Sequence, residues 1–430
     1  MTLRLPHARV AVGGFDEVVT HEGYRRGEPG FRRVSLALFA AGLATFSLLY
    51  AVQALLPALS EEFHVSPAAS GLTVSLGTGA LALLVVPIST LSERYGRTRV
   101  MTISVVAAAL IGLALAVCTS FSVLLGLRAV QGIALAGLPA VAMAYLAEEV
   151  HPDSFGQAIG LYVAGNAVGG LSGRLLASFV AGLVNWRAAL VAVGVSAVAC
   201  VLVYRVALPR ASNFRPAPLR FGPLVGGLRE HLADRQMRRL FLLGMLLMGQ
   251  FVTVYNYLSY RLLAAPFHLP QTLVGLIFLV YLTGIYAAAA GGRLADRIGR
   301  RPTLIGAVAV AAVGALLTLP NVLPLIGIGL IALTVGFFAA HATASGWVSA
   351  QARTGRAQAA ALYLCAYYAG SAVIGWFGGV LYAWAGWPGT GGFVLALLVV
   401  SLGVGLTLRS PAASGAVRSE PGVEFHPASP

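Results

Sequence analysis

Gly292-Arg293-Leu294-Ala295-Asp296-Arg297-Ile298-Gly299-Arg300-Arg301 is the stretch of sequence that decides the fold. Long apolar runs flank it on both sides, although the stretch itself carries four arginines and an aspartate. Glycine permits a tight turn without a steric penalty. Arginines beside a carboxylate fit the boundary between hydrocarbon and water, where their stems can stay apolar and their heads wet. The stretch therefore predicts a short charged turn between two membrane helices.

A weaker copy of this turn lies in the first half of the chain, at Ser89-Thr90-Leu91-Ser92-Glu93-Arg94-Tyr95-Gly96-Arg97. Its leucine, glycine and two arginines recur at one constant offset, with Glu93 in place of Asp296. Two halves that repeat in the same topology imply a pseudo-two-fold axis along the membrane normal, with a binding site between them.

Composition indicates a chain that lies mostly in lipid. Of its 430 residues 58% are hydrophobic and only 10% are charged, against about 25% charged in average soluble domains. A soluble domain, a nucleic-acid binder and a disordered chain are excluded on this ground. Crossing the hydrocarbon core takes about 20 apolar residues, and the chain has twelve such runs. They are 34–59, 68–91, 100–118, 121–147, 156–181, 187–207, 238–262, 271–292, 302–319, 322–346, 358–383 and 387–408.

The predicted fold is thus an all-α membrane protein of twelve transmembrane helices in two six-helix halves. The expected division is a cytoplasmic N-tail (1–33), a first bundle (34–207), a cytoplasmic linker (208–237), a second bundle (238–408) and a cytoplasmic C-tail (409–430). All 29 basic residues are arginine, and most of them lie in the tails, the linker and the turns on one side. Because cytoplasmic loops carry the excess of positive charge, both termini are expected to be cytoplasmic.

The two charged turns form a candidate conformational latch. Their arginines can pair with the carboxylate or with helix C-termini, and so hold the cytoplasmic ends of the two halves together until an event breaks the cluster. Lipid anchoring is the alternative, but it explains neither the glycines nor the acid. The latch set consists of Glu93, Arg94, Gly96, Arg97, Gly292, Asp296, Arg297, Gly299, Arg300 and Arg301.

Several polar residues inside apolar runs are candidates for coupling or substrate contact. Arg128, with Gln131 one turn later, sits where a charge costs several kcal/mol, so it must face the bundle interior or bind backbone carbonyls of a neighbouring helix. Asn166 and Arg174 continue a small and polar stripe along the run 156–181. Close packing through small residues is an equally open interpretation of that stripe.

A proton carrier must titrate, and no acid lies in the middle of any of the twelve runs. His341 is the histidine within a helix core, and Glu148 and Glu149 stand at an inner helix end. These three residues form the short list for proton coupling, although a lone histidine is more often a packing residue.

A further set of polar and aromatic side chains is expected to line a shared cavity, because tyrosine both stacks on a solute and hydrogen-bonds it. The set is Thr45, Tyr50, Gln53, Tyr162, Gln250, Asn256, Tyr257, Tyr281, Tyr363 and Tyr367.

Enzyme signatures are missing from the sequence. No lysine is present, which removes phosphate-loop and Schiff-base chemistry, and neither a zinc-protease motif nor a nucleophile elbow appears. The three cysteines have no paired spacing. We therefore expect no enzymatic activity, no metal and no cofactor, and a driving force that comes from an ion or solute gradient.

The sequence resembles the YnfM-like (acriflavine-sensitivity) branch of the major facilitator superfamily over roughly residues 26–408. The charged turn fits the signature loop of that superfamily, and matching blocks begin at Arg26, Tyr145, Gly160, Tyr255 and Gly336. The resemblance implies a monomeric, multi-pass protein of the bacterial inner membrane. It further implies alternating access and secondary transport, as proton-coupled efflux of a drug or sugar-like compound. Two intramembrane arginines without a buried acid point instead to an anion or a neutral solute, so uptake of such a solute is the alternative function.

Overall fold

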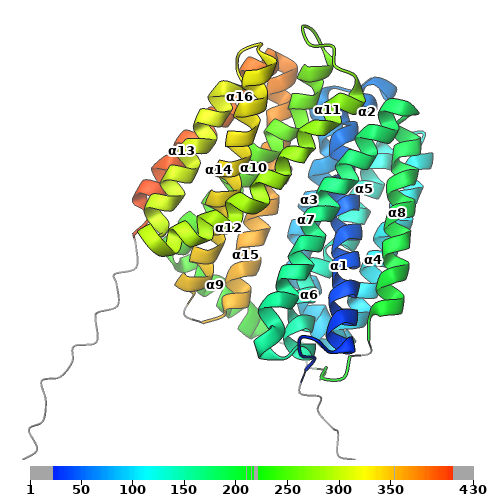
Figure 1. The fold of residues 1–430 in the computed structure, drawn as a ribbon, viewed down its shortest axis with the longest axis vertical. Helices are drawn as coiled ribbons and strands as arrows, with labels where there is room; N and C mark the ends of the chain where they lie inside the picture. Colours follow the sequence, from blue (N-terminus) through cyan, green and yellow to red (C-terminus); the bar gives the residue numbers. More distant parts are fainter. Residues whose placement is uncertain (1–22, 210, 215, 217–220, 353, 410–430) are drawn as a thin grey trace, which may run out of the picture.

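The computed structural model describes residues 23–209, 211–214, 216, 221–352 and 354–409 (Figure 1). The outer parts of the two expected tails, 1–22 and 410–430, lie outside the described residues. Helices account for nearly all of the described chain, as the long apolar runs predict.

The first half forms one bundle, shown in blue to green in Figure 1. Three of its helices begin with a proline at the first helical position. The side chain of Ser66 caps one of these three, and that of Asn185 caps the last helix of the bundle. One short 3₁₀ turn, Ala51–Leu55, lies within the predicted run 34–59. A second one, Leu115–Val117, lies at the end of the predicted run 100–118. The helices are α1 (Pro29–Tyr50), α2 (Leu56–Glu62), α3 (Pro67–Tyr95), α4 (Arg97–Ala114), α5 (Phe121–Leu135), α6 (Gly137–Glu149), α7 (Pro152–Leu183) and α8 (Trp186–Ala207).

The second half forms the other bundle, shown in light green to red. A 3₁₀ turn, Gly275–Val280 (η3), lies near the start of the predicted run 271–292, and a π-helical turn, Gly370–Ile374 (η4), lies within the predicted run 358–383. The helices are α9 (Phe221–Ala233), α10 (Arg235–Leu263), α11 (Gln271–Val274), α12 (Tyr281–Ile298), α13 (Arg300–Leu317), α14 (Leu323–Gln351), α15 (Arg356–Ala369) and α16 (Gly375–Thr407).

Ten helices among the described residues are long and apolar enough to cross a membrane. The last of them, 356–407, bends at Gly386, whose φ of 61° is non-helical, and so contains two of the predicted runs. The predicted run 156–181 falls within α7, which is not one of the ten. The helical membrane fold is confirmed, while the number of twelve crossings stays a prediction.

The two halves meet side by side. We call the end that carries the turns at Gly96 and Gly299 the motif face, and the opposite end the far face. Both glycines have positive φ, 98° and 95°, which allows the backbone to reverse between two long helices. The start of α1 and the linker helix α9 also lie at the motif face (Figure 1). Between the halves, α3 packs along α15, η4 and α16, whereas α7 is met by α11 and η3.

Hydrogen bonds between the halves concentrate toward the far face. Tyr260 bonds to Ser60 at 2.7 Å, and Gln271 donates to the carbonyl of Ala54 at 2.8 Å. Nearer the middle, Cys365 donates to the carbonyl of Ala82. Closer to the motif face than this, no hydrogen bond or ion pair joins the two halves within the described part of the chain. The halves are therefore fastened at the far face and separable at the motif face.

The segment that joins the halves is anchored on both. Ser212 and Asn213 bind the carboxylate of Glu149 in the first half, and His231 of α9 lies 3.2 Å from the carbonyl of Gly355 in the second. The linker boundaries 208–237 stay a prediction, as do the other domain limits.

Candidate functional site

A cavity of about 390 Å³ lies between the two halves. The first half contributes residues of α1, α6 and α7 to its wall, and the second half contributes residues of α10, α12, α14 and α15. Seven of the residues singled out by sequence line it: Tyr50, Tyr162, Asn166, Arg174, Tyr281, His341 and Tyr367. The glycines of α7 pack closely on α1, and this contact sets the orientation of α7 about its axis. Its polar stripe therefore faces the cavity.

Arg174 is the charged group of the cavity. Its side chain is only 3% exposed, and its guanidinium donates to Gln53 Oε1 and to the carbonyl of Gly170, both at 2.6 Å. The same group lies over the rings of Tyr50 and Tyr281, 4.3 and 4.7 Å from their centroids. No carboxylate pairs with Arg174 among the described residues. Cation–π contacts and neutral acceptors hold this charge without neutralising it.

His341 lies on the opposite wall. Its Nδ1 is 2.9 Å from the hydroxyl of Tyr363, and its ring packs against Phe337 and Tyr367. This histidine is half-buried and reaches the cavity from α14. The imidazole of His341 therefore sits among aromatic rings in the wall that the second half contributes.

A chain of polar side chains closes the cavity toward the far face. Gln53 accepts from Arg174 and donates to Asn256 Oδ1 of the other half at 2.6 Å. Both amides are fully buried. Tyr257, next along α10, donates to the carbonyl of Gly375 and stacks on Tyr260 and Tyr382. These three predicted cavity residues thus form a floor between the halves rather than the open wall.

Thr45 and Gln250 are also buried, and their polar side-chain atoms have no partner among the described residues. Tyr363 is held behind His341. The sequence placed all three in the cavity lining; the structure places them beside the lining, where a water or a moved side chain would be needed to reach a solute.

Comparison with known proteins identifies the architecture. The family model of the Major Facilitator Superfamily matches residues 34–263 and 240–429. The chain belongs to this superfamily. It is 43% identical over 385 residues to the inner membrane transport protein YnfM of Escherichia coli, which covers 90% of this chain and 92% of that protein. It is 41% identical over 378 residues to the uncharacterized MFS-type transporter YybF of Bacillus subtilis, covering 88% and 94%.

Solved structures agree on the fold. A bacterial homolog of the human lysosomal transporter Spinster, in an inward-facing and occupied conformation, superposes with a TM-score of 0.75 at 16% identity, covering 89% of this chain and 97% of that chain. The protein is therefore a multi-pass membrane transporter of the facilitator fold, and its family is one of transporters rather than enzymes. The cavity occupies the position between the halves where such a fold binds its substrate.

Arg128 of this facilitator does not reach the cavity. Its fully buried guanidinium donates to the carbonyls of Thr73, Leu48 and Leu49 and to Gln131 Oε1, at 2.5 to 3.2 Å. Gln131 in turn donates to the carbonyl of Ala108. The pair ties α1, α3, α4 and α5 together just behind Tyr50. This is the carbonyl-binding alternative that the sequence left open.

Glu148 and Glu149 lie at the motif face, away from the cavity. Arg97 donates to Glu148 at 3.0 Å, and Glu149 accepts hydrogen bonds from Ser212 and Asn213. Both acids therefore have structural partners in the first half and the linker, and they are not brought together with His341.

The latch set is divided in this structure. Arg97, in the first copy, bonds Glu148 and Ser92 of its own half. In the second copy, Asp296 and Arg297 are exposed, and Arg301 donates to the carbonyl of Leu406 in its own half. No hydrogen bond or ion pair of these residues crosses between the halves in the described chain. With the motif face separable, a latch between the halves would be released here.

Sequence reasoning missed most of the aromatic wall. The missed lining rings are Phe46, Phe251, Phe337, Phe338 and Tyr368. Phe251 and Phe337 stack with centroids 3.9 Å apart, and Phe337 stacks on His341 one turn away. Phenylalanine in an apolar run gives no signal of its own, but the i to i+4 spacing of Phe337 to the already selected His341 could have found that ring.

Proposed function

We propose that this transporter carries a small organic anion with an apolar or aromatic body by alternating access, and that His341 carries the coupled proton. The observation that carries the proposal is Arg174, a buried cavity arginine with no carboxylate partner among the described residues. We further propose that the motif face is the cytoplasmic one, in keeping with the concentration of arginines on that side.

The positive charge of the cavity indicates a negatively charged substrate. A guanidinium in low dielectric attracts an anion strongly and repels a cation, and no acid lines the cavity to reverse the sign. A substrate carboxylate could accept a bidentate pair of hydrogen bonds from Arg174, replacing the neutral Gln53 that now accepts one. The rings of Tyr50 and Tyr281 would flank the apolar body of the same molecule. A lipophilic cation fits this wall poorly.

The same contact suggests how binding leads to movement. Arg174 holds Gln53, and Gln53 holds Asn256 of the other half. An anion that draws the guanidinium away leaves Gln53 free to turn, which weakens the floor that closes the far face. Substrate would thus compete with Gln53 for the guanidinium of Arg174, and its binding would favour opening of the far face.

Proton coupling is assigned to His341 because it is the histidine of the cavity wall, and no Asp or Glu is among the described residues that line the cavity. The groups that face it are the hydroxyl of Tyr363 and the rings of Tyr367 and Phe337, with Arg174 across the cavity. A protonated imidazole would add a second positive charge for an anion to bind.

Export of a neutral drug-like or sugar-like solute by proton exchange is a second candidate. The observation that favours it is the number of rings in the cavity wall, because aromatic faces stack on uncharged bodies as well. The two candidates differ in their need for Arg174.

Flux into proteoliposomes separates them. An aromatic monocarboxylate such as benzoate, an uncharged sugar and a cationic dye are offered to the wild type and to Arg174→Gln, with and without a pH gradient. We expect saturable carboxylate flux that the gradient accelerates and that Arg174→Gln lowers at least about tenfold, the scale of a lost charged hydrogen bond. Arg187→Gln, which removes an arginine paired with Glu62 at the far face, is the matched control and should transport normally.

Sugar or dye flux that exceeds carboxylate flux and survives Arg174→Gln would refute the anion proposal. Flux that ignores the pH gradient in the wild type would refute proton coupling and leave a uniporter. A His341→Gln variant that still concentrates substrate against its gradient would refute the role given to that residue.

A further inference from the structure

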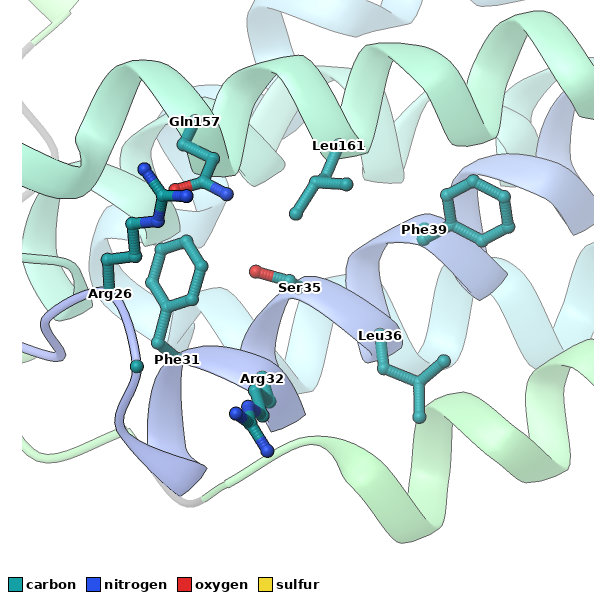
Figure 2. A pocket seen from close by; sticks show the side chains of 9 residues that line it. Arg26, Phe31, Arg32, Ser35, Leu36, Phe39, Gln157 and Leu161 are labelled. Carbon is teal, nitrogen blue, oxygen red and sulfur yellow. The ribbon is translucent and has the colours of Figure 1, made fainter.

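A second hollow lies on the other flank of α7, at the motif face (Figure 2). It encloses about 460 Å³ between the first turns of α1 and of α7, and we call it the α1–α7 pocket. Gln157 and Leu161 of α7 line it, whereas Asn166 of the same helix lines the central cavity. Gly165 and Gly169, which pack directly on the backbone of α1, separate these two flanks. The pocket and the central cavity therefore lie on different sides of α7.

Two arginine side chains give the rim of the pocket a positive charge. The guanidinium groups of Arg26 and Arg32 are exposed and make no hydrogen bond or ion pair with any described residue. The nearby carboxylate of Glu28 accepts a hydrogen bond from the backbone N–H of Arg25. Figure 2 shows both arginines near the start of α1, on either side of Phe31.

One buried polar atom points into the pocket. Ser35 is 7% exposed, and its hydroxyl has no hydrogen-bond partner within the described part of the chain. In Figure 2 this hydroxyl is directed into the space between α1 and α7. A buried hydroxyl left without a partner costs about 1–3 kcal/mol, so a polar atom of a ligand at this position would recover that cost.

Below the rim the pocket turns apolar. Leu36 is 52% exposed, and Phe39 and Leu161 continue the surface toward the middle of the membrane. From Arg32 to Phe39 the helix rises by about 10 Å, which is the distance from headgroup level into the acyl region of one leaflet. Charge at one end and apolar surface at the other match a phospholipid in its natural orientation.

We propose that the α1–α7 pocket binds an anionic phospholipid. Its phosphate pairs with Arg26 and Arg32 and accepts a hydrogen bond from Ser35, and an acyl chain lies over Leu36, Phe39 and Leu161. A free phosphate would satisfy the rim alone and leave the apolar floor uncovered. The bound lipid fills the groove where α1 and α7 diverge, and so supports the bundle that carries Arg174.

The test uses the full chain in detergent, titrated with phosphatidylglycerol, phosphatidylcholine or inorganic phosphate and followed by native mass spectrometry. One phosphatidylglycerol is expected to bind more tightly than phosphatidylcholine. Since one basic residue near an anionic lipid surface is worth about fivefold in binding, Arg26→Gln with Arg32→Gln should weaken that first adduct by about tenfold or more. Arg235→Gln, an exposed arginine at another helix start on the same face, is the charge-matched control and should bind like the wild type.

Hydrogen–deuterium exchange in nanodiscs locates the lipid. Phosphatidylglycerol should protect the segment 26–39 relative to phosphatidylcholine, and Ser35→Phe, which fills the pocket, should abolish the difference while the arginines remain. Equal binding of the two lipids, a double variant that binds like Arg235→Gln, or protection produced by inorganic phosphate alone would each overturn the proposal. The last result would show a free-anion site instead.

Discussion

Arg128 and Arg174 are two arginines in apolar helices with different surroundings. Arg128 donates four hydrogen bonds, to backbone carbonyls of α1 and α3 and to Gln131, and it does not line the cavity. Arg174 donates hydrogen bonds to Gln53 and to the carbonyl of Gly170, and it lines the cavity. The sequence predicts that both must be buried and satisfied, because an arginine in hydrocarbon is expensive. Only the partners show which one supports the bundle and which one is free to meet a substrate.

Arg128→Ala is therefore expected to destabilise the protein more than Arg174→Gln does. Removing the guanidinium deletes its hydrogen bonds to the carbonyls of Thr73, Leu48 and Leu49, and a hydrogen bond from a charged donor is worth about 1.5–3 kcal/mol. Thermal unfolding of the detergent-solubilised variants measures the difference. An Arg128→Ala protein as stable as the wild type would contradict the structural role given to this residue.

At the scale of elements, α1 and α7 pack more closely than ordinary side chains allow. A Cβ added at Gly169 would lie 2.3 Å from the carbonyl oxygen of Leu43, and one added at Gly165 would lie 2.4 Å from that of Phe39. The glycine-rich stretch 156–181 predicts close helix packing. The sequence does not show which helix packs against this stretch. In the structure it is α1, and this contact decides which face of α7 is left for the cavity.

Gly169→Ala should lower stability, because the clash is with backbone and cannot be relieved by a rotamer change. Gly160→Ala is the matched control on the same helix. Nothing lies within 4 Å of its added Cβ, so it should be neutral or stabilise by up to about 1 kcal/mol through helix propensity. Unfolding temperatures of the two variants, measured side by side, decide the matter; equal effects would mean that the contact with α1 is looser than described.

At the scale of the whole molecule, the far face holds the halves together while the motif face does not. Gly182 of α7 lies against Thr272 of α11 at the far face, with an added Cβ 2.7 Å from Thr272 Cγ2. The alternating access that we propose requires this contact to separate in each cycle. A covalent bond across it should therefore stop transport without unfolding the protein.

A disulfide between Gly182→Cys and Thr272→Cys, in a background without Cys118, Cys200 and Cys365, should reduce flux to near zero, and dithiothreitol should restore it. The control pair Leu113→Cys with Gly194→Cys joins two neighbours within the first half and should leave flux unchanged. Full transport by the oxidised Gly182–Thr272 pair would show that the far face need not open.

We propose that the charged turns take part in the same transport cycle. Asp296 is exposed and has no partner from the other half in this conformation. If the latch forms only when the motif face closes, Asp296→Asn should slow transport severalfold while leaving unfolding in this state unchanged. Flux at saturating substrate and a melting curve of the same preparation measure the two effects. A variant that loses stability but transports at the normal rate would refute the latch.

The sequence by itself determined the membrane class, the helices, the internal repeat and the burial of Arg128 and Arg174, because hydrophobic length, glycine turns and the cost of a buried charge are properties of local sequence. It could not determine which side of each helix meets the cavity, since each position turns by about 100° and the rotation is fixed by the neighbouring helix. The tertiary structure therefore decided that Phe251 and Phe337 face the cavity while Tyr257 and Tyr363 stand behind or below it. It also decided that Glu148 and Glu149 bind the motif-face framework, because their partners, Arg97 and Ser212, come from elements distant in the chain.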